Sequence, residues 1–359
     1  MSPEPRSGLL SGVRVLDLTI WRPGPYATQL LAEIGADVLK VEPPGGDPMR
    51  TYPDLFASLN ANKRSVVLDL KAGDDLARGL DLAAEADVVV EGFRPGVTDR
   101  LGVGYDHVVV RNPAVIYCSV SGMGQTGPLA QVAGHDLNYQ AWAGSLAPDG
   151  GPPVVAPLPI ADLTGGVMAA FAICAALVRR ITSGEGERID LAMADVLATW
   201  TGAARAQADG VDRAVRGVPG YGTFVAADGL YLALGVLTED HFWTALCDVL
   251  DLDDVRDLGF LDRMGRVEEL QGRIAVSIAS APRESLLAAM LEVGVPVAPV
   301  ADRAEMLDHP HFRERGVATR DAWADPAVGY PIRFGRHPAG RDRPPPSLDE
   351  HRGSGFLPR

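Results

Sequence analysis

The sequence predicts an α/β protein in which a large parallel-sheet domain is followed by a smaller α+β domain. Short apolar runs alternate with amphipathic segments of helical spacing through the first 120 residues, a pattern typical of a parallel sheet covered by helices on both faces. From about Pro219 the pattern changes to a hairpin followed by helices. The length of 359 residues also exceeds that of one ordinary core, so two domains are expected.

The strands and helices of the first half follow one another in regular order. Val- and Leu-rich runs predict strands at residues 12–18, 37–43, 65–70, 87–93 and 114–120. Between them, apolar residues at helical spacing predict helices at residues 26–36 and 74–86 and a helical stretch from Thr98. Ligands of such sheets bind beyond the carboxyl ends of the strands, so the loops after these strands are candidate sites.

Beyond Gly122 the chain becomes rich in Gly and Pro before regular elements return. We expect an apolar helix that begins after Asp162, a strand at 187–193 and a helix at 194–208. The longest apolar run, residues 166–178, ends at Arg179 and is too short to span a bilayer, so a buried helix is expected there.

The second domain has a different pattern. Residues 223–236 alternate around an Ala-Asp-Gly turn and predict a β-hairpin. A helix at 239–252 follows, with further helices to about residue 307. The Pro-rich segment at 336–351 is expected to be an extended surface segment.

The composition excludes several classes of function. A net charge of −14 argues against nucleic-acid partners, because phosphate binding needs clustered Lys and Arg. Cys118, Cys174 and Cys247 fit neither a CxxC metal pair nor a disulfide framework, so no metal site is expected. The N-terminal residues lack the apolar run of a signal peptide. We therefore expect a cytoplasmic protein without membrane insertion.

The common catalytic motifs are absent from the sequence. It contains no GxGxxG after the first strand, no GxxxxGK[ST], no HExxH and no GxSxG, which weakens the case for a nicotinamide cofactor or nucleotide hydrolysis. His135 in AGHDLNYQ and Asp162 in PIADLTGG remain as the candidate pair. Taken singly, His135 also fits a hydrogen-bonded loop residue, and Asp162 also fits a helix N-cap.

Eight segments in order carry a family resemblance: LSGVRVLDLT, LLAEIGADVLKVEPPGGD, LNANKRSVVLDLK, DVVVEGFRPGVTDRLG, GQTGP, GHDLNY, ADLTGG and SGEGERIDLAM. Together they closely resemble the family III CoA-transferases (CaiB/BaiF), a group that includes formyl-CoA and carnitine CoA-transferases and the α-methylacyl-CoA racemases. The resemblance covers roughly residues 8 to 245.

This resemblance implies a particular domain organisation. Residues 1–200 and a returning tail at 325–359 are expected to form a large Rossmann-like domain that binds CoA, and residues 219–324 a small domain. It also implies a homodimer whose chains are threaded through each other like linked rings. Each active site would then lie between one chain's large domain and the other chain's small domain.

Within the family, the aspartate at the position of Asp162 has two uses. In transferases it is the nucleophile that attacks a thioester, and in racemases it is one of two proton acceptors. The second acceptor is the histidine of the motif held here as GHDLNY, which makes His135 a base. Glu239 aligns with a glutamate that contacts this histidine, and Asp240 competes for that role. Inverting an α-carbon needs a group on each face, so both bases are required.

The main expectation is therefore a 2-methylacyl-CoA racemase or epimerase that acts by two-base 1,1-proton transfer through an enolate. The alternative is a CoA-transferase that moves CoA between carboxylic acids through an anhydride on Asp162. The segment RGVPGYGTFV has no run of glycines, which argues against the formyl-CoA branch. Leu158 stands where racemases carry asparagine, and PLPIADLTGG is closer to transferase sequences.

The resemblance also implies a CoA site in the first half of the chain, with CoA as part of an acyl-CoA substrate and no prosthetic group. The implied contacts follow parallel strands, where Arg and Lys would pair with phosphates and Phe93 would pack against adenine. They are Trp21, Arg22, Lys71, Gly92, Phe93, Arg94, Arg100 and Tyr139.

Overall fold

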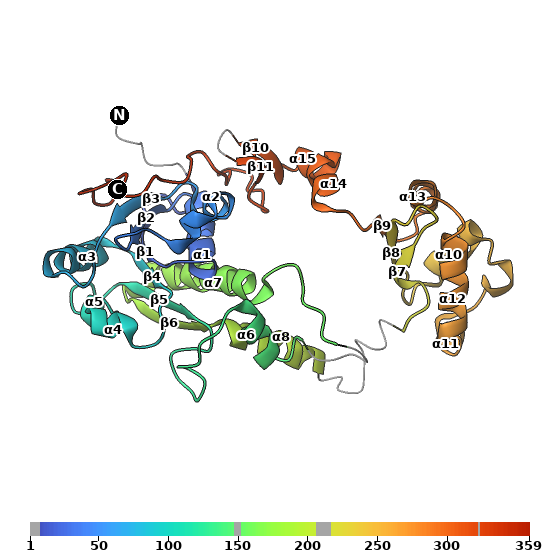
Figure 1. The fold of residues 1–359 in the computed structure, drawn as a ribbon, viewed down its shortest axis with the longest axis horizontal. Coiled ribbons are helices and arrows are strands. Elements are labelled where there is room, and N and C mark those ends of the chain that lie inside the picture. Colours follow the sequence, from blue (N-terminus) through green and yellow to red (C-terminus); the bar gives the residue numbers. More distant parts are fainter. Residues whose placement is uncertain (1–7, 147–151, 206–216, 322–323) are drawn as a thin grey trace. The chain divides into compact units, whose positions relative to one another are not determined.

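The computed structural model describes residues 8–146, 152–205, 217–321 and 324–359. Its main sheet has six parallel strands in the order β3-β2-β1-β4-β5-β6 (Figure 1). The strands are β1 (Arg14–Leu18), β2 (Asp37–Glu42), β3 (Arg64–Val67), β4 (Val88–Glu91), β5 (Ile116–Ser121) and β6 (Glu187–Ala192). The predicted parallel sheet and all five strands of the first half are confirmed, as is the strand after the apolar helix.

Helices cover both faces of this sheet, as its apolar strands require. Every residue of β4 and β5 is buried, because alternate side chains face opposite layers. Val88 and Ile116 belong to a core with α1 and α7, whereas Val89 and Tyr117 belong to a second core with α3 and α5. These helices are α1 (Pro23–Glu33), α3 (Gly73–Glu85), α5 (Tyr105–Val109) and α7 (Ile160–Ser183).

Shorter helices complete this part of the chain. They are η1 (Pro48–Thr51), α2 (Pro53–Asn60), α4 (Val97–Leu101), α6 (Asp136–Trp142) and α8 (Met193–Arg205). The expected helical stretch from Thr98 is thus two short helices, α4 and α5, separated by Gly102, which has a positive φ of 81° and ends α4.

Helix α7 is longer than the sequence predicted. Its 24 residues begin before Asp162, not after it, and by length and composition alone it could cross a membrane. That corrects the expectation that the apolar run is too short. Ala161, Ala169 and Ile173 are nevertheless buried in the core that α7 shares with α1 and the sheet. A Cβ on Gly166 would lie 2.9 Å from the carbonyl oxygen of Pro23, so the start of α1 is in direct contact with the second turn of α7.

The strand order creates a switch point between β1 and β4. Strand β1 pairs with β2 on one side and with β4 on the other, through Val15↔Val38 and Val15↔Val88. The loops that leave these two strands therefore diverge at the carboxyl edge of the sheet, which is where the ligands of such sheets bind. The loop after β1 holds Trp21 and Arg22, and the loop after β4 holds residues 92–94.

The chain divides into two compact units, Met1–Thr201 with His309–Arg359, and Gly202–Asp308. We expected the small domain at 219–324 and the returning tail from 325, so residues 309–324 group with the large unit instead. The returning part includes α15 (Pro310–Glu314), β10 (Ala318–Asp321) and β11 (Ala324–Val328), and the last two strands form an antiparallel pair.

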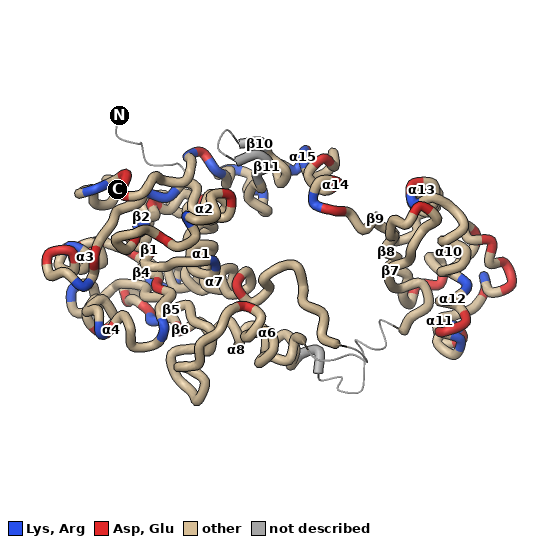
Figure 2. Tube along the Cα trace, in the orientation of Figure 1, with Lys and Arg blue, Asp and Glu red and all other residues tan. Residues whose placement is uncertain are grey.

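The second unit is built on the predicted hairpin, which is confirmed as β7 (Tyr221–Val225) and β8 (Tyr231–Gly235). A third strand, β9 (Val297–Pro299), pairs antiparallel with β8 and was not predicted, because three residues that end in Pro carry no alternation. The helices are α10 (Asp240–Leu250), η2 (Asp253–Val255), α11 (Phe260–Met264), α12 (Val267–Ile278), α13 (Arg283–Glu292) and α14 (Arg303–Asp308). Acidic and basic residues are interspersed along them (Figure 2).

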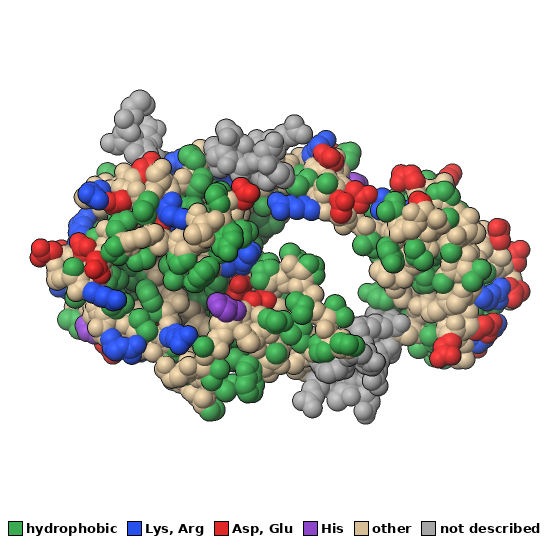
Figure 3. Space-filling view, in the orientation of Figure 1, with side chains coloured by type: hydrophobic (Ala, Val, Ile, Leu, Met, Phe, Trp, Pro, Cys, Tyr) green, Lys and Arg blue, Asp and Glu red, His purple; other side chains and the backbone are tan. Residues whose placement is uncertain are grey.

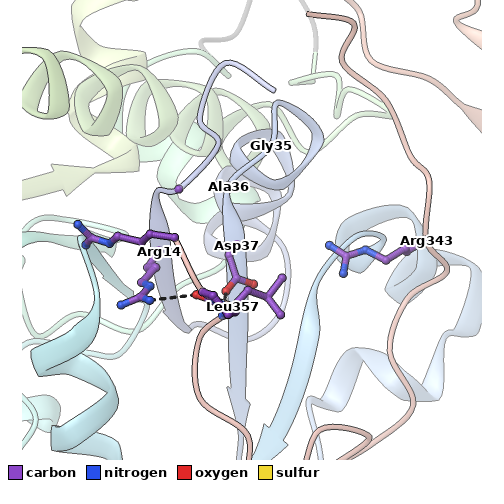
Figure 4. Close-up of a pocket in the computed structure, with 9 residues that line it drawn as sticks. Arg14, Gly35, Ala36, Asp37, Arg343 and Leu357 are labelled. Atoms are coloured by element: carbon purple, nitrogen blue, oxygen red, sulfur yellow. Dashed lines mark hydrogen bonds between the residues drawn. The ribbon is translucent and has the colours of Figure 1, made fainter. Parts of the chain in front are cut away.

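The Pro-rich tail is bound to the large unit. Asp349 Oδ1 accepts from the Val67 N–H at 2.9 Å, and the His351 N–H donates to the Ser65 carbonyl at 2.9 Å. The tail thus covers β3, an edge strand that would otherwise expose unpaired backbone groups. Arg14 Nη2 donates to the Leu357 carbonyl at 3.0 Å, in a small pocket at the amino ends of β1 and β2 (Figure 4). That pocket lies at the edge of the sheet opposite to the switch point.

Candidate active site

His135 stands at the start of a short helix. It is the N-cap of α6, with extended backbone, and its N–H donates to Asn138 Oδ1 at 3.0 Å. The spacing His-x-x-Asn follows from this cap, because a side chain three residues on reaches back to the first free N–H. The imidazole is exposed. In the region of α6 and the start of α7, a histidine lies beside acidic and basic side chains on the surface (Figure 3).

Asp162 is the third residue of α7, and Pro159 is the N-cap, so the N-cap interpretation of Asp162 is wrong. The Asp162 N–H donates to Asp136 Oδ1 at 3.0 Å. Burial, together with the charge of Asp136, raises the pKa of the Asp162 carboxyl to about 6, although Arg22 and His135 pull it down. The four side chains are therefore close enough to interact electrostatically.

Asp136 is a site residue that the sequence analysis did not select. Its Oδ2 accepts from Gln140 Nε2 at 2.5 Å while its Oδ1 holds the first turn of α7. One carboxylate thus joins α6 to α7 and satisfies an N–H that the helix start leaves free. Its position beside His135 was visible, but its contact with a residue 26 positions away was not.

Tyr139 holds the segment that carries His135. Its hydroxyl donates to the Gly134 carbonyl at 2.5 Å, and the side chain is 8% exposed. A Cβ on Gly122 would lie 2.2 Å from the ring, so glycine is required where the ring crosses the end of β5. Burial raises the pKa of Tyr139, as does Asp162, whereas Arg94 lowers it. Arg94 therefore also faces this cluster.

The loop after β1 is held from beneath by buried charges. Trp21 has a positive φ of 65°, and its N–H donates to Asp47 Oδ1 at 3.3 Å. Asp47 pairs with Lys40 at 2.9 Å, and Lys63 pairs with Asp17 at 3.0 Å, all four with fully buried side chains. Buried pairs of this kind need complete hydrogen bonding to be tolerated. A lysine within an otherwise apolar strand indicates a buried ion pair, and the sequence analysis did not select Lys40 on that ground.

A buried carboxyl also supports the loop after β4. Glu91 Oε2 accepts from the Phe93 N–H at 2.8 Å, and burial raises the pKa of Glu91 to about 7. Phe93 packs partly against the core beneath it. Gly92 lies close to Thr19 at the end of β1, which joins the two sides of the switch point.

The remaining candidates are more widely spread. Lys71, on a loop, and Arg100, in the last turn of α4, are both exposed on the large unit. Glu239 is the N-cap of α10 in the second unit, while His135 belongs to the first. Its competitor Asp240 accepts from the buried Arg263 at 2.8 Å, which occupies that carboxylate. Among the described residues, no group of three or more His, Cys, Asp and Glu side chains could hold a metal ion.

Comparison with protein families gives a match to CoA-transferase family III over residues 10–352. The chain is 34% identical to an acetyl-CoA:oxalate CoA-transferase of Acetobacter aceti over 97% of this chain and 95% of the relative. It is 33% identical to a succinate–glutarate CoA-transferase of Agrobacterium fabrum over 95% and 93%. It is 36% identical to a succinyl-CoA:mesaconate CoA-transferase of Haloarcula hispanica over 96% and 95%.

Solved structures share the fold. A CAIB/BAIF family protein from Brucella suis superposes with a TM-score of 0.86 at 29% identity, over 96% of this chain and 98% of that one. A protein from M. tuberculosis gives a TM-score of 0.87 at 30% identity over the same shares. The three sequence relatives named above are all CoA-transferases, which favours CoA transfer over the racemase that was the main expectation.

Proposed function

The chain belongs to the family III CoA-transferases, and from that premise we propose that it moves CoA from an acyl-CoA to a free carboxylic acid with Asp162 as the nucleophile. The observation that carries this proposal is the half-buried Asp162 carboxylate in the first turn of α7, beside Arg22, Asp136 and His135. The relatives' names support the same enzyme class.

In this mechanism Asp162 attacks the thioester carbonyl, which forms a mixed anhydride and releases the CoA thiolate. The thiolate attacks the Asp162 carbonyl of that anhydride, so the first acid departs and CoA remains on Asp162 as a thioester. An incoming carboxylate attacks that thioester and gives a second anhydride and free CoA thiolate. Attack of the thiolate on the acyl carbonyl then yields the new acyl-CoA and restores the Asp162 carboxylate.

The environment of Asp162 suits a nucleophile. Its pKa is raised to about 6, mainly by burial, so the carboxylate is mostly ionised near neutral pH yet poorly solvated. A poorly solvated carboxylate loses less water when it attacks. The enzyme needs no prosthetic group or metal for this chemistry, because the acyl-CoA itself carries the activated carbonyl.

The carboxyl edge of the sheet at the switch point between β1 and β4 is the proposed CoA site. Trp21 lies on one side of it and residues 92–94 lie on the other, on loops that buried carboxyl groups hold in place. Arg94, Arg100 and Lys71 make no ion pair with another described residue in this structure, which leaves them available for phosphates. Since the net charge is −14, attraction of CoA has to be local.

We further propose that two copies associate and that α7 contributes to their interface. On α7, Val167, Phe171, Val178 and Ile181 are 47%, 65%, 67% and 83% exposed. Together with Cys174 they repeat at steps of four and three residues, the spacing with which helices pack against other helices. This apolar row supports the homodimer that the resemblance implies. The linked-ring threading, Glu239 as a partner of His135 and a cytoplasmic location remain part of the proposal.

A racemase is the second candidate function. It is favoured by the electrostatic interaction of His135 with Asp162, because a two-base inversion needs both groups at one α-carbon. In that case His135 and Asp162 would exchange the α-proton through an enolate, and the acyl group would be a 2-methylacyl chain.

Incubation with a 2-methylacyl-CoA in D2O separates the two functions. For a transferase we expect no deuterium at the α-carbon, and CoA appearing on an added carboxylic acid. Deuterium uptake without any acid acceptor would favour the racemase. His135→Ala is the second arm: it should leave the covalent Asp162 thioester detectable by hydroxylamine trapping if the enzyme is a transferase, whereas it should abolish exchange in a racemase.

A further inference from the structure

We propose that the acid substrate is a dicarboxylate and that Arg22 binds the carboxylate that does not react. This inference rests on the proposed CoA transfer at Asp162 and concerns the specificity of that site. Arg22 would then belong to the acyl end of the substrate and not to the nucleotide end.

The packing of α1 on α7 brings Arg22 to the nucleophile. Arg22 is the N-cap of α1, and its carbonyl accepts from the Tyr26 N–H at 2.9 Å. The next residue, Pro23, touches α7 at Gly166, one turn after Asp162. Arg22 and Asp162 therefore emerge side by side from two helix starts that are packed together.

Arg22 is a half-buried cation without an acidic partner in the described part of the chain. Three other arginines of the large unit that are buried or half-buried have one: Arg50 pairs with Glu42, Arg64 with Asp37 and Arg180 with Asp87. No ion pair within 4.0 Å joins Arg22 to Asp162 or to another described carboxylate, yet its charge lowers the pKa of Asp162. The guanidinium thus lies near the nucleophile and keeps its hydrogen-bond donors free for an anion.

The reaction decides which carboxylate Arg22 binds. The carboxylate that attacks the Asp162 thioester has to be a free nucleophile, and a bidentate ion pair with Arg22 would lower its reactivity. A second carboxylate on the same acid has no such conflict, and without a cation it would be repelled by Asp136. The relatives named for oxalate, succinate, glutarate and mesaconate all use acids with two carboxylates.

The test compares two acceptors of equal length, a four-carbon dicarboxylate and a four-carbon monocarboxylate, with one acyl-CoA donor. The readout is the ratio of their kcat/KM values, in which a general loss of activity or CoA affinity cancels. For the unmodified protein we expect a preference for the dicarboxylate. Arg22→Met should reduce the ratio about 10- to 100-fold, the usual effect of losing a charge-assisted pair. Arg22→Lys, which keeps the charge but loses the planar fork, should reduce it less.

Arg100→Met is the matched control, because it removes an exposed arginine of the proposed CoA surface. It should lower kcat/KM for both acceptors and leave the ratio unchanged. A ratio near one in the unmodified protein, or a ratio that Arg22→Met leaves unchanged, would overturn the inference while CoA transfer stands. Absence of transfer to every acid, with no hydroxylamine-trapped Asp162, would overturn the proposed function and this inference together.

Discussion

The backbone N–H of Asp162 donates a hydrogen bond to Oδ1 of Asp136 at 3.0 Å, so two carboxyl groups meet at the first turn of α7. Asp136 holds the start of the helix and at the same time raises the pKa of Asp162 through its charge. Asp136 therefore helps to fix the position of the candidate nucleophile and adds to the effect of burial on its pKa.

Asp136→Asn tests this coupling. The amide oxygen can still accept from the Asp162 N–H, but the negative charge is gone. The pKa of Asp162 should fall below about 6, because one of the causes that raises it has been removed. Activity requires the ionised carboxylate, so the acid limb of kcat/KM against pH should move to lower pH. An acid limb at the same pH in both proteins would show that Asp136 does not set the acidity of Asp162.

Asp162→Asn should stabilise the free protein while it abolishes transfer. The folded-state pKa of Asp162 is raised from 3.8 to about 6, so its contribution to stability is present below the unfolded pKa and is lost as pH rises through about 6. An uncharged side chain avoids that loss. We therefore expect Asp162→Asn to raise the free energy of unfolding by about 1–3 kcal/mol at about pH 8. Urea unfolding at several pH values measures it. The gain should shrink toward about pH 4, where Asp162 is protonated in both states; a constant gain would have another cause.

Gly122→Ala should disturb the segment that carries His135. A Cβ there would lie 2.2 Å from the Tyr139 ring, so the ring has to move and its hydrogen bond to Gly134 is lost. We expect a loss of about 1–3 kcal/mol in unfolding free energy together with lower activity. Gly272→Ala in α12 is the control, since nothing lies within 4 Å of its Cβ position, and it should stabilise by up to about 1 kcal/mol. Equal melting temperatures for Gly122→Ala and the unmodified protein would contradict the packing argument.

Lys71 should be the lysine that amine reagents modify first. The chain has three lysines, and Lys40 and Lys63 are 0% and 2% exposed. If Lys71 contacts the CoA phosphates, a saturating acyl-CoA should slow its labelling, as peptide mass spectrometry would measure. Lys71→Arg should remove the labelled peptide and keep CoA affinity nearly unchanged, because the charge remains. Labelling at the same rate with and without acyl-CoA would place Lys71 outside the CoA site.

Phe171→Asp should weaken association of the proposed homodimer. Phe171 is 65% exposed in the middle of the apolar row on α7, and a buried unpaired carboxylate in an interface is costly. We expect a lower molar mass by sedimentation at micromolar concentration. Val110→Asp, at an 81% exposed position outside that row, should leave the mass unchanged. If Phe171→Asp stays as large as the unmodified protein, α7 is not part of the interface.

The residues of the candidate site were selected from the sequence motifs and from the family resemblance that they carry. His135 and Asp162 remained as the candidate pair once the common catalytic motifs were found to be absent, and the family resemblance implied their roles. The same resemblance implied Trp21, Arg22 and residues 92–94, which follow parallel strands. In the structure Arg22 and His135 interact electrostatically with Asp162, and Gly92 lies close to Thr19. Asp136, Asp47 and Glu91 were missed, because their contribution is a hydrogen bond to the backbone of another segment or loop, and residue type alone does not reveal such a partner.

The sequence by itself determined the class of fold and the order of its elements, because runs of apolar residues and their spacing are properties of neighbouring residues. Only the tertiary structure decided that α7 starts before Asp162, that the chain from His309 returns to the large unit and that Arg22 lies near Asp162. These relationships join residues far apart in the chain. They are set by how helices pack on a sheet, with small residues such as Gly166 permitting the close approach of α1 and α7.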